Sequence, residues 1–206
     1  MLIWAAAFLL WAWDAAAPAR PGQAAVRIGL AGVTVRELRH PPGIGRRRFL
    51  PANPLQPFEA AILLDRGEAD GRDMRDGLAL FERFRRELRP AQWLSGALYL
   101  LVFAAIPAAV WRWSFAMILP WGLALTYALL IAACLWLFSV RGRYGLSRGE
   151  ALNMCVQILL CPPYGANLAR RLAARRRPAL DPLVLARALD PDNARFLFAD
   201  AVEVAQ

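Results

Sequence analysis

The chain has 206 residues, of which 58% are hydrophobic, and its 25 basic residues exceed its 16 acidic residues to give a net charge of +9. This length allows one membrane unit with small flanking segments and excludes two large independent domains. Three cysteines with no C-x-x-C spacing and no neighbouring histidine exclude a disulfide framework and a zinc site. Every basic residue is arginine, which together with the many alanines and prolines indicates a GC-rich bacterial genome.

Residues 1–19 form an N-terminal apolar segment that allows two interpretations. Leu2–Trp13 is uncharged, and Ala17-Pro18-Ala19 fits the small-x-small cleavage site of a secretory signal, whose apolar core has about 7–15 residues. A signal normally begins with lysine or arginine, and this segment has neither before Arg20. The second interpretation is therefore an uncleaved anchor over about Leu2–Ala19 with its N-terminus outside. The segment alone leaves both open.

Residues 20–89 are expected to form a small mixed soluble region. Apolar residues alternate from Val26 and return as β-branched residues after an Ala-Gly turn, which predicts a β-hairpin over Val26–Leu38. The prolines and glycines of His40–Pro57 predict an extended, largely irregular connection. We expect a short helix at Phe58–Leu64 and an exposed loop at Asp65–Gly77.

The end of this region has the pattern of a basic amphipathic helix over Leu78–Leu88. Leu78, Phe81, Phe84 and Leu88 share one face, and arginines occupy the rest. Such a helix can lie along lipid headgroups with its apolar face toward the membrane. It can equally pack that face against the soluble region.

Residues 90–140 predict a transmembrane hairpin, because Arg112 is the only charge in this apolar stretch. About 20 residues at ~1.5 Å rise cross a hydrocarbon core of ~30 Å, so the halves on either side of Arg112 predict spans at about 93–111 and 114–140. Tryptophan favours the membrane interface. We therefore expect Trp93, Trp111 and Trp113 to lie there. Neither span contains a carboxylate or a histidine, which argues against ion-coupled transport.

Residues 141–206 predict basic interfacial helices followed by an acidic helical tail. Ser147 and Glu150 match a capping box that opens a helix over Glu150–Cys161, which Pro162-Pro163 ends. These prolines argue against a third span in the uncharged run 151–169. A basic helix is expected at Asn167–Arg177. Proline at the first helical position predicts two short closing helices, Pro182–Leu189 and Pro191–Val204.

Two rules give different orientations. Arginines flank the hairpin on both outer sides, so the positive-inside rule places both flanks in the cytoplasm and the tip at Arg112 outside. A cleaved signal would instead deliver both flanks outside. An uncleaved N-terminal span satisfies both the charge pattern and the apolar segment, and we favour it.

The excess of arginine beside the spans indicates contact with anionic lipid rather than with nucleic acid, since each arginine near an anionic leaflet contributes about 1 kcal/mol. His40 lacks catalytic neighbours, and Gly43-Ile-Gly45 lacks the spacing of a phosphate-binding loop. No catalytic, cofactor or metal-binding residue is therefore predicted. The residues expected to contact headgroups are Arg83, Arg85, Arg86, Arg89, Arg141, Arg143, Arg170, Arg171, Arg175, Arg176 and Arg177.

The sequence thus predicts a mainly α-helical, multi-pass protein of the bacterial inner membrane. We expect a non-enzymatic accessory or interaction subunit of a membrane complex, which contacts the lipid bilayer and either a protein partner or a second copy of itself. One alternative is a subunit of an oligomeric transporter or channel. Another is a membrane enzyme that uses Cys155 or Cys161.

Overall fold

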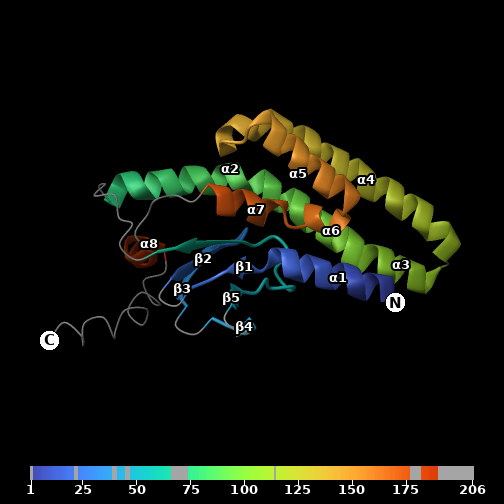
Figure 1. Ribbon diagram of the computed structural model, residues 1–206, viewed down its shortest axis with the longest axis horizontal. Coiled ribbons are helices and arrows are strands. Elements are labelled where there is room, and N and C mark those ends of the chain that lie inside the picture. Colours follow the sequence, from blue (N-terminus) through green and yellow to red (C-terminus); the bar gives the residue numbers. More distant parts are fainter. Residues whose placement is uncertain are drawn as a thin grey trace.

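The computed structural model describes residues 2–20, 23–38, 41–44, 47–65, 74–113, 115–176 and 182–189. Two long helical rods form its frame (Figure 1). The first comprises α2 (Met74–Leu100), a π-helical turn (Leu101–Ala105) and α3 (Ile106–Arg112), and the second is α4 (Phe115–Val140). The stretches 76–112 and 115–144 are each long and apolar enough to cross a membrane. The two apolar helices of the hairpin expected at 90–140 are therefore present.

The first rod is longer than the predicted span, because the basic amphipathic helix and the span form one helix that continues through Pro90. The apolar face of its first half does not point toward headgroups. Phe81, Phe84 and Leu88 are buried in one cluster with Val26 and Ile62 of the sheet. Of the two placements that the sequence allowed, packing against the soluble region is correct and the headgroup placement of this face is wrong.

The described strands form two small sheets. The one that packs against this first half of α2 has the strand order β3-β2-β6 and is antiparallel, with β2 (Ala24–Ile28) between β3 (Val33–Glu37) and β6 (Ala60–Leu64). The predicted hairpin is its β2–β3 pair, in which Val26 lies opposite Val35. The other sheet has the order β1-β5-β4 and consists of β1 (Ala17–Pro18), β5 (Arg47–Leu50) and β4 (Gly43–Ile44).

One expectation for the soluble region is wrong, because the helix predicted at Phe58–Leu64 is the strand β6. The connection expected to be extended and largely irregular at His40–Pro57 is so in its described residues, which contain the short strands β4 and β5. A short apolar run fits a buried strand and a buried helix equally well, and only its neighbours decide between them. Here β2 supplies hydrogen-bonding partners along the whole of β6, and a helix from the far end of the chain, α7 (Leu168–Arg175), packs against it.

The C-terminal helices form a second, shorter hairpin against the frame. Helix α5 (Arg148–Leu160) begins at the predicted capping box of Ser147 and Glu150 and runs back along α4. After α6 (Pro162–Gly165), α7 returns along α2 (Figure 1). The short helix α8 (Pro182–Leu189) has the predicted bounds and contacts β3. The helix predicted at Pro191–Val204 lies outside the described residues.

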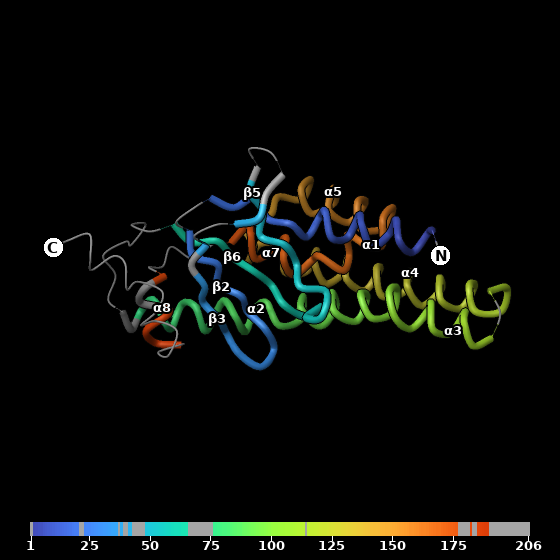
Figure 2. Tube along the Cα trace, turned by 90° about the horizontal axis from the view of Figure 1, so that it is seen from below, coloured from blue at the N-terminus to red at the C-terminus, as the bar shows by residue number. Residues whose placement is uncertain are grey.

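Helix α1 (Leu2–Ala15) is shorter than the anchor expected over Leu2–Ala19, because Ala17–Pro18 is the strand β1. Its 14 residues extend about 21 Å at ~1.5 Å per residue, less than the ~30 Å of a hydrocarbon core. It lies along the hairpin toward the end formed by α3 (Figure 2). The ring pairs Phe8–Phe103 and Trp11–Tyr99 fix its direction as antiparallel to the first rod.

A hydrogen bond from α1 explains how the first rod tolerates Pro107. In the π-helical turn the Ile106 N–H bonds to the Leu101 carbonyl, five residues back. The same pattern would pair residue 107 with the Val102 carbonyl, but proline has no N–H to donate. The indole Nε1 of Trp4 donates to that Val102 oxygen at 3.0 Å instead. The N-terminal helix thus satisfies a backbone group that Pro107 leaves unpaired.

We predict that Trp4→Phe lowers the free energy of unfolding by about 1–2 kcal/mol, the cost of an unpaired buried carbonyl. The exposed Trp111 provides a control, and Trp111→Phe should change stability by less than about 0.5 kcal/mol. Thermal and denaturant unfolding in detergent micelles measures both.

A second variant, Pro107→Ala, restores a backbone N–H near Val102 and makes the indole donor dispensable. Trp4→Phe should therefore cost much less in the Pro107→Ala background than in the wild-type chain. An equal cost in both backgrounds would mean that Trp4 stabilises the protein by ring packing alone.

Candidate functional site

The most polar part of the interior lies where α1 and α7 meet. The two helices follow one another along α2 (Figure 1). Helix α1 contacts the half of the first rod that leads to the tip, at Tyr99 and Phe103. The contacts of α7 and of Arg176, which follows it, lie earlier on the rod, at Ser95 and Glu87. We call the meeting point the α1–α7 junction and define it as Trp11, Asp14, Asn167, Arg170 and Arg171.

Asn167 connects the two helices. It precedes α7 at the N-cap position and is fully buried, yet its side chain does not cap the helix. Its Nδ2 donates to the Trp11 carbonyl and to Asp14 Oδ2, both at 3.0 Å. The capping is done from α2, because Ser95 Oγ accepts the Ala169 N–H at 2.9 Å. One side chain therefore joins segments more than 150 residues apart.

Asp14 and Arg171 form the ion pair of the junction. The Nε atom of Arg171 donates to Asp14 Oδ2 at 3.2 Å, and its Nη2 donates to Oδ1, which makes the pair bidentate. Arg171 also donates to Gln157 Oε1 at 2.9 Å and lies over the ring of Tyr164. Both charged side chains are less than a quarter exposed. A bidentate pair this well shielded from water is stronger than an exposed one.

Arg170 extends the junction toward the sheet. Its guanidinium lies over the ring of Trp11 and donates to Asn167 Oδ1 at 3.0 Å. Burial lowers its pKa to about 10, although Glu59 acts in the opposite direction. At neutral pH the side chain is therefore still charged. Two donors here, Trp11 Nε1 and Arg170 Nη2, have no acceptor among the described residues.

Glu59, beside β6, is the buried acid that faces this guanidinium. It is 7% exposed and pairs with Arg27 of β2 at 3.1 Å. Burial raises its pKa above the ordinary 4.5, and Arg27 and Arg170 only partly offset this effect. The acid and the two arginines connect the sheet electrostatically to the junction.

The side chains of the junction hold protein segments in position. The five residues of the junction supply one carboxylate, two guanidiniums, an amide and an indole, and none of them carries a hydroxyl or thiol that could act as a nucleophile. Among the residues that the structure describes, no three His, Cys, Asp or Glu side chains gather as metal ligands. The junction therefore fixes how α1, α7 and the sheet meet.

The predicted headgroup arginines fall into two groups. One group belongs to α7 or directly follows it: Arg170 and Arg171 are part of the junction, Arg175 pairs with Glu150, and Arg176 with Glu87. The other group lies around the end of the hairpin opposite the tip and consists of Arg83, Arg85, Arg86, Arg89, Arg141 and Arg143. Three of these also contact protein, since Arg83 pairs with Glu87, Arg85 with Glu82, and Arg141 donates to the Phe138 carbonyl. Arg177 lies outside the described residues.

The three predicted interface tryptophans are all exposed. Both Trp111, in the last turn of α3, and Trp113, which follows that helix, lie at the tip of the hairpin. Trp93 lies on α2 against the ring of Phe58, at a centroid distance of 5.3 Å. That ring occupies the space beside Gly96, where an added Cβ would lie 2.1 Å from Phe58 Cδ1. The loop before β6 is therefore held close to the hairpin.

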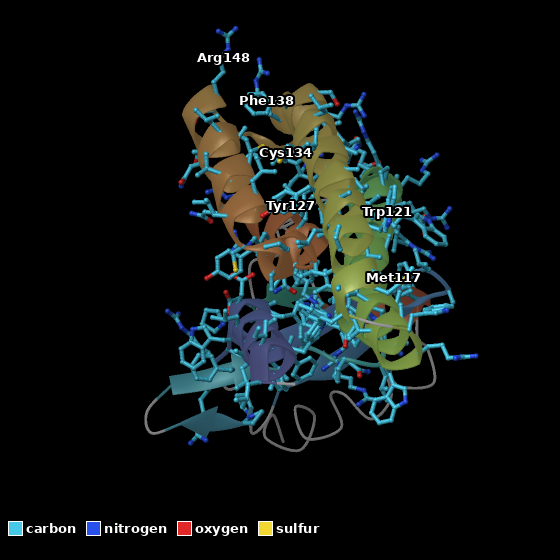
Figure 3. The ribbon with its side chains drawn as sticks, turned by 90° about the vertical axis from the view of Figure 1, so that its right-hand side faces the viewer. Met117, Trp121, Tyr127, Cys134, Phe138 and Arg148 are labelled. Atoms are coloured by element: carbon cyan, nitrogen blue, oxygen red, sulfur yellow. The ribbon has the colours of Figure 1, made fainter. Side chains whose placement is uncertain are left out.

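The cysteines are placed poorly for catalysis. Cys134 of α4 and Cys155 of α5 are buried, and each thiol lies 3.9 Å from the other residue's carbonyl oxygen. Figure 3 shows Cys134 between the two helices. Burial raises the pKa of Cys161, the partly exposed one, whereas a reactive cysteine needs a lowered pKa.

Sequence reasoning missed Asp14, Asn167, Arg27 and Glu59 as parts of a site. Asp14 gave one signal, because it is a lone carboxylate at the end of an apolar run. Its partners are more than 150 positions away, so no local pattern could identify them.

We predict that Asp14→Asn lowers the free energy of unfolding by about 2–4 kcal/mol, because it leaves the shielded charge of Arg171 without an anion. The exposed pair Arg175–Glu150 is the matched control. Arg175→Gln removes it while keeping the capping box, and should cost no more than about 1 kcal/mol. Equal losses in the two variants would contradict a structural role for the junction.

The raised pKa of Glu59 predicts how stability depends on pH. The folded protein holds this proton more tightly than the unfolded chain, so stability is greatest below pH 4.5 and declines as the pH rises through the folded pKa. The contribution of Glu150 to stability depends on pH in the opposite direction, since hydrogen bonds from Ser147 and Arg175 lower its pKa to about 2. Its contribution is lost only in acid below the ordinary value.

Thermal unfolding between about pH 5 and about pH 8 therefore isolates Glu59 from Glu150. The difference in stability between Glu59→Gln and the wild-type protein should grow in favour of the variant as the pH rises. A difference that does not change with pH would contradict the raised pKa.

Comparison with known proteins does not assign the chain to a family. No protein-family model matches the chain, and neither does any curated protein or solved structure. What the protein does is therefore inferred from its own residues.

Proposed function

We propose that this is a small integral protein of the bacterial inner membrane that acts by contact with another membrane helix, as an accessory subunit of a complex or as a self-associating protein. The observation that carries the proposal is the outer face of α4. That face is apolar and exposed along nearly the whole helix, and small residues recur on it at every fourth position.

The membrane location is supported by the amount of apolar surface that the fold leaves uncovered. Figure 3 shows Met117 and Trp121 directed away from the other helices. Contiguous patches of this kind are rare on soluble monomers. The large apolar residues exposed on α4 and α5 are Phe115, Met117, Trp121, Leu123, Leu125, Tyr127, Ile131, Leu135, Leu152, Val156 and Leu160.

The helix-contact role is supported by Ala124, Ala128 and Ala132. These residues are exposed and lie on one side of α4, four residues apart. Small residues at this spacing let two helices approach closely within a bilayer, where van der Waals packing drives association. Trp121 and Leu135 flank the alanines and are both exposed. A partner helix could therefore pack on the alanines between these two side chains.

The orientation that we propose retains residues 2–15. Cleavage after Ala19 would remove the Trp4 hydrogen bond, the Trp11 ring that is 1% exposed, and the anion that pairs with Arg171. A segment this well integrated favours the uncleaved interpretation over a signal peptide. With its N-terminus beside the tip, both basic flanks lie in the cytoplasm, in accord with the positive-inside rule.

Two other functions have less support. A thiol enzyme would need an activated cysteine, and Cys161 is shifted in the opposite direction. For a pore-forming subunit, the junction does bring Asp14 and Arg171 next to the spans, but the two charges neutralise each other. Ion flux through liposomes that contain the purified protein would favour the pore over the accessory role.

The topology is tested with reporter fusions after Gly77 and after Gln206, together with sequencing of the mature N-terminus. We expect both fusions to report the cytoplasm and the chain to keep its first residues. External reporters with a chain that starts near Arg20 would contradict the proposal.

The helix contact is tested with a photo-crosslinking residue in place of Leu135 in intact cells. We expect one discrete protein adduct that Ala128→Leu abolishes, because a leucine there blocks close approach. Ala108→Leu, at an exposed alanine on α3, is the control and should leave the adduct unchanged. Adducts to lipid alone would contradict the accessory role.

A further inference from the structure

A pocket of about 430 Å³ lies between α2 and α4 at the end of the hairpin that the arginines surround. Arg83 and Arg86 of α2 line one side, and Arg143, which follows α4, lines another. We propose that this pocket binds an anionic phospholipid, with the phosphate between the arginines. The inference rests on the membrane location proposed above and adds a specific ligand site to it.

The charge of the lining favours an anion. Three arginines line the pocket against one carboxylate, Glu87. That carboxylate already pairs with Arg83 at 3.1 Å and with Arg176 from α7. An incoming phosphate therefore meets a net positive surface, and guanidinium forks match the geometry of phosphate oxygens.

The rest of the lining favours a lipid over a free phosphate. Trp136 and Val140 belong to the apolar run of α4, and Pro90 is the last residue before the apolar half of α2. The pocket thus combines a basic part with an apolar part. A phospholipid has the complementary order, because its charged phosphate and its apolar chains meet at the glycerol. Trp136 and Tyr144 also form an aromatic wall, with their ring centroids 6.3 Å apart.

The fold holds this wall in place. The hydroxyl of Tyr144 donates to the Glu87 carbonyl at 3.0 Å, which ties the end of α4 to α2. Gly145 follows with a φ of 64°, the left-handed conformation that glycine adopts without strain, and turns the chain into α5. These contacts fix the separation of the two rods at the pocket.

The experiment is native mass spectrometry of the full-length protein in detergent, titrated with phosphatidylglycerol or with zwitterionic phosphatidylcholine. We expect wild-type protein to retain one phosphatidylglycerol in preference to phosphatidylcholine. The double variant R86Q/R143Q should bind it at least about tenfold more weakly, since each arginine contributes about 1 kcal/mol and 1.4 kcal/mol is tenfold.

The matched control is R148Q, which removes one exposed arginine at the same end of the bundle but outside the pocket (Figure 3). It should bind phosphatidylglycerol like the wild-type protein. Trp136→Leu should weaken phosphatidylglycerol binding without changing the net charge. Thermal unfolding without lipid establishes that each variant is folded.

Three results would overturn the proposal. The first is equal retention of the two lipids by the wild-type protein, and the second is an equal effect of R86Q/R143Q and R148Q. The third is displacement of phosphatidylglycerol by millimolar glycerol 3-phosphate or inorganic phosphate, which would assign the pocket to a soluble phosphate. Release of the protein from membranes by alkaline carbonate would instead contradict the membrane location itself, so the two failures are distinguishable.

Discussion

A helix that ends or bends among apolar side chains must find partners for its free backbone groups, and this protein meets that need with side chains from distant parts of the chain. Ser95 of α2 accepts a hydrogen bond from the first turn of α7. The indole of Trp4 donates to the carbonyl that Pro107 leaves unpaired, and Asn167 donates to the Trp11 carbonyl in the last turn of α1. In water these groups could be solvated. In the membrane location that we propose they cannot be, and an unsatisfied group there costs several kcal/mol.

This constraint explains why α1 meets α7. Helix α1 is too short to cross a bilayer, and α7 is shorter still. Both helices pack on the first rod, and their ends meet at the junction. The C-terminal end of one helix and the N-terminal end of the other carry opposite partial charges, so the meeting is favourable. The Asp14–Arg171 pair then fixes its geometry.

The proposed functions use surfaces that this arrangement leaves open. The sheet, α1 and α7 pack on the first rod, whereas α4 packs between that rod and α5 and keeps its alanine face exposed. The pocket lies at the end of the hairpin opposite the tip. There the Tyr144 hydroxyl donates to the backbone of α2 and holds the end of α4 beside the arginines. The interior therefore holds the helices together, and the exposed apolar surface is available to the partner helix or the lipid that we propose.

The sequence by itself determined the apolar hairpin, the capped start of α5, the bounds of α8 and the pairing of β2 with β3. Each of these follows from a local pattern: an uncharged run, Ser147 with Glu150, Asp181-Pro182, or alternation around a turn. The first rod was determined only in part, because nothing local shows that the amphipathic helix continues through Pro90.

Only the tertiary structure decided the rest. Phe58–Leu64 reads as helix or strand until β2 supplies its hydrogen-bonding partners, and the apolar face of Phe81 and Leu88 suits a membrane or a sheet equally well. The arginines of α7 are indistinguishable in sequence, yet Arg170 and Arg171 are drawn into the junction while Arg175 remains exposed. Asp14 and Asn167 show no relation in sequence. Ion pairing and burial depend on distances between elements, and those distances exist only after the helices have packed.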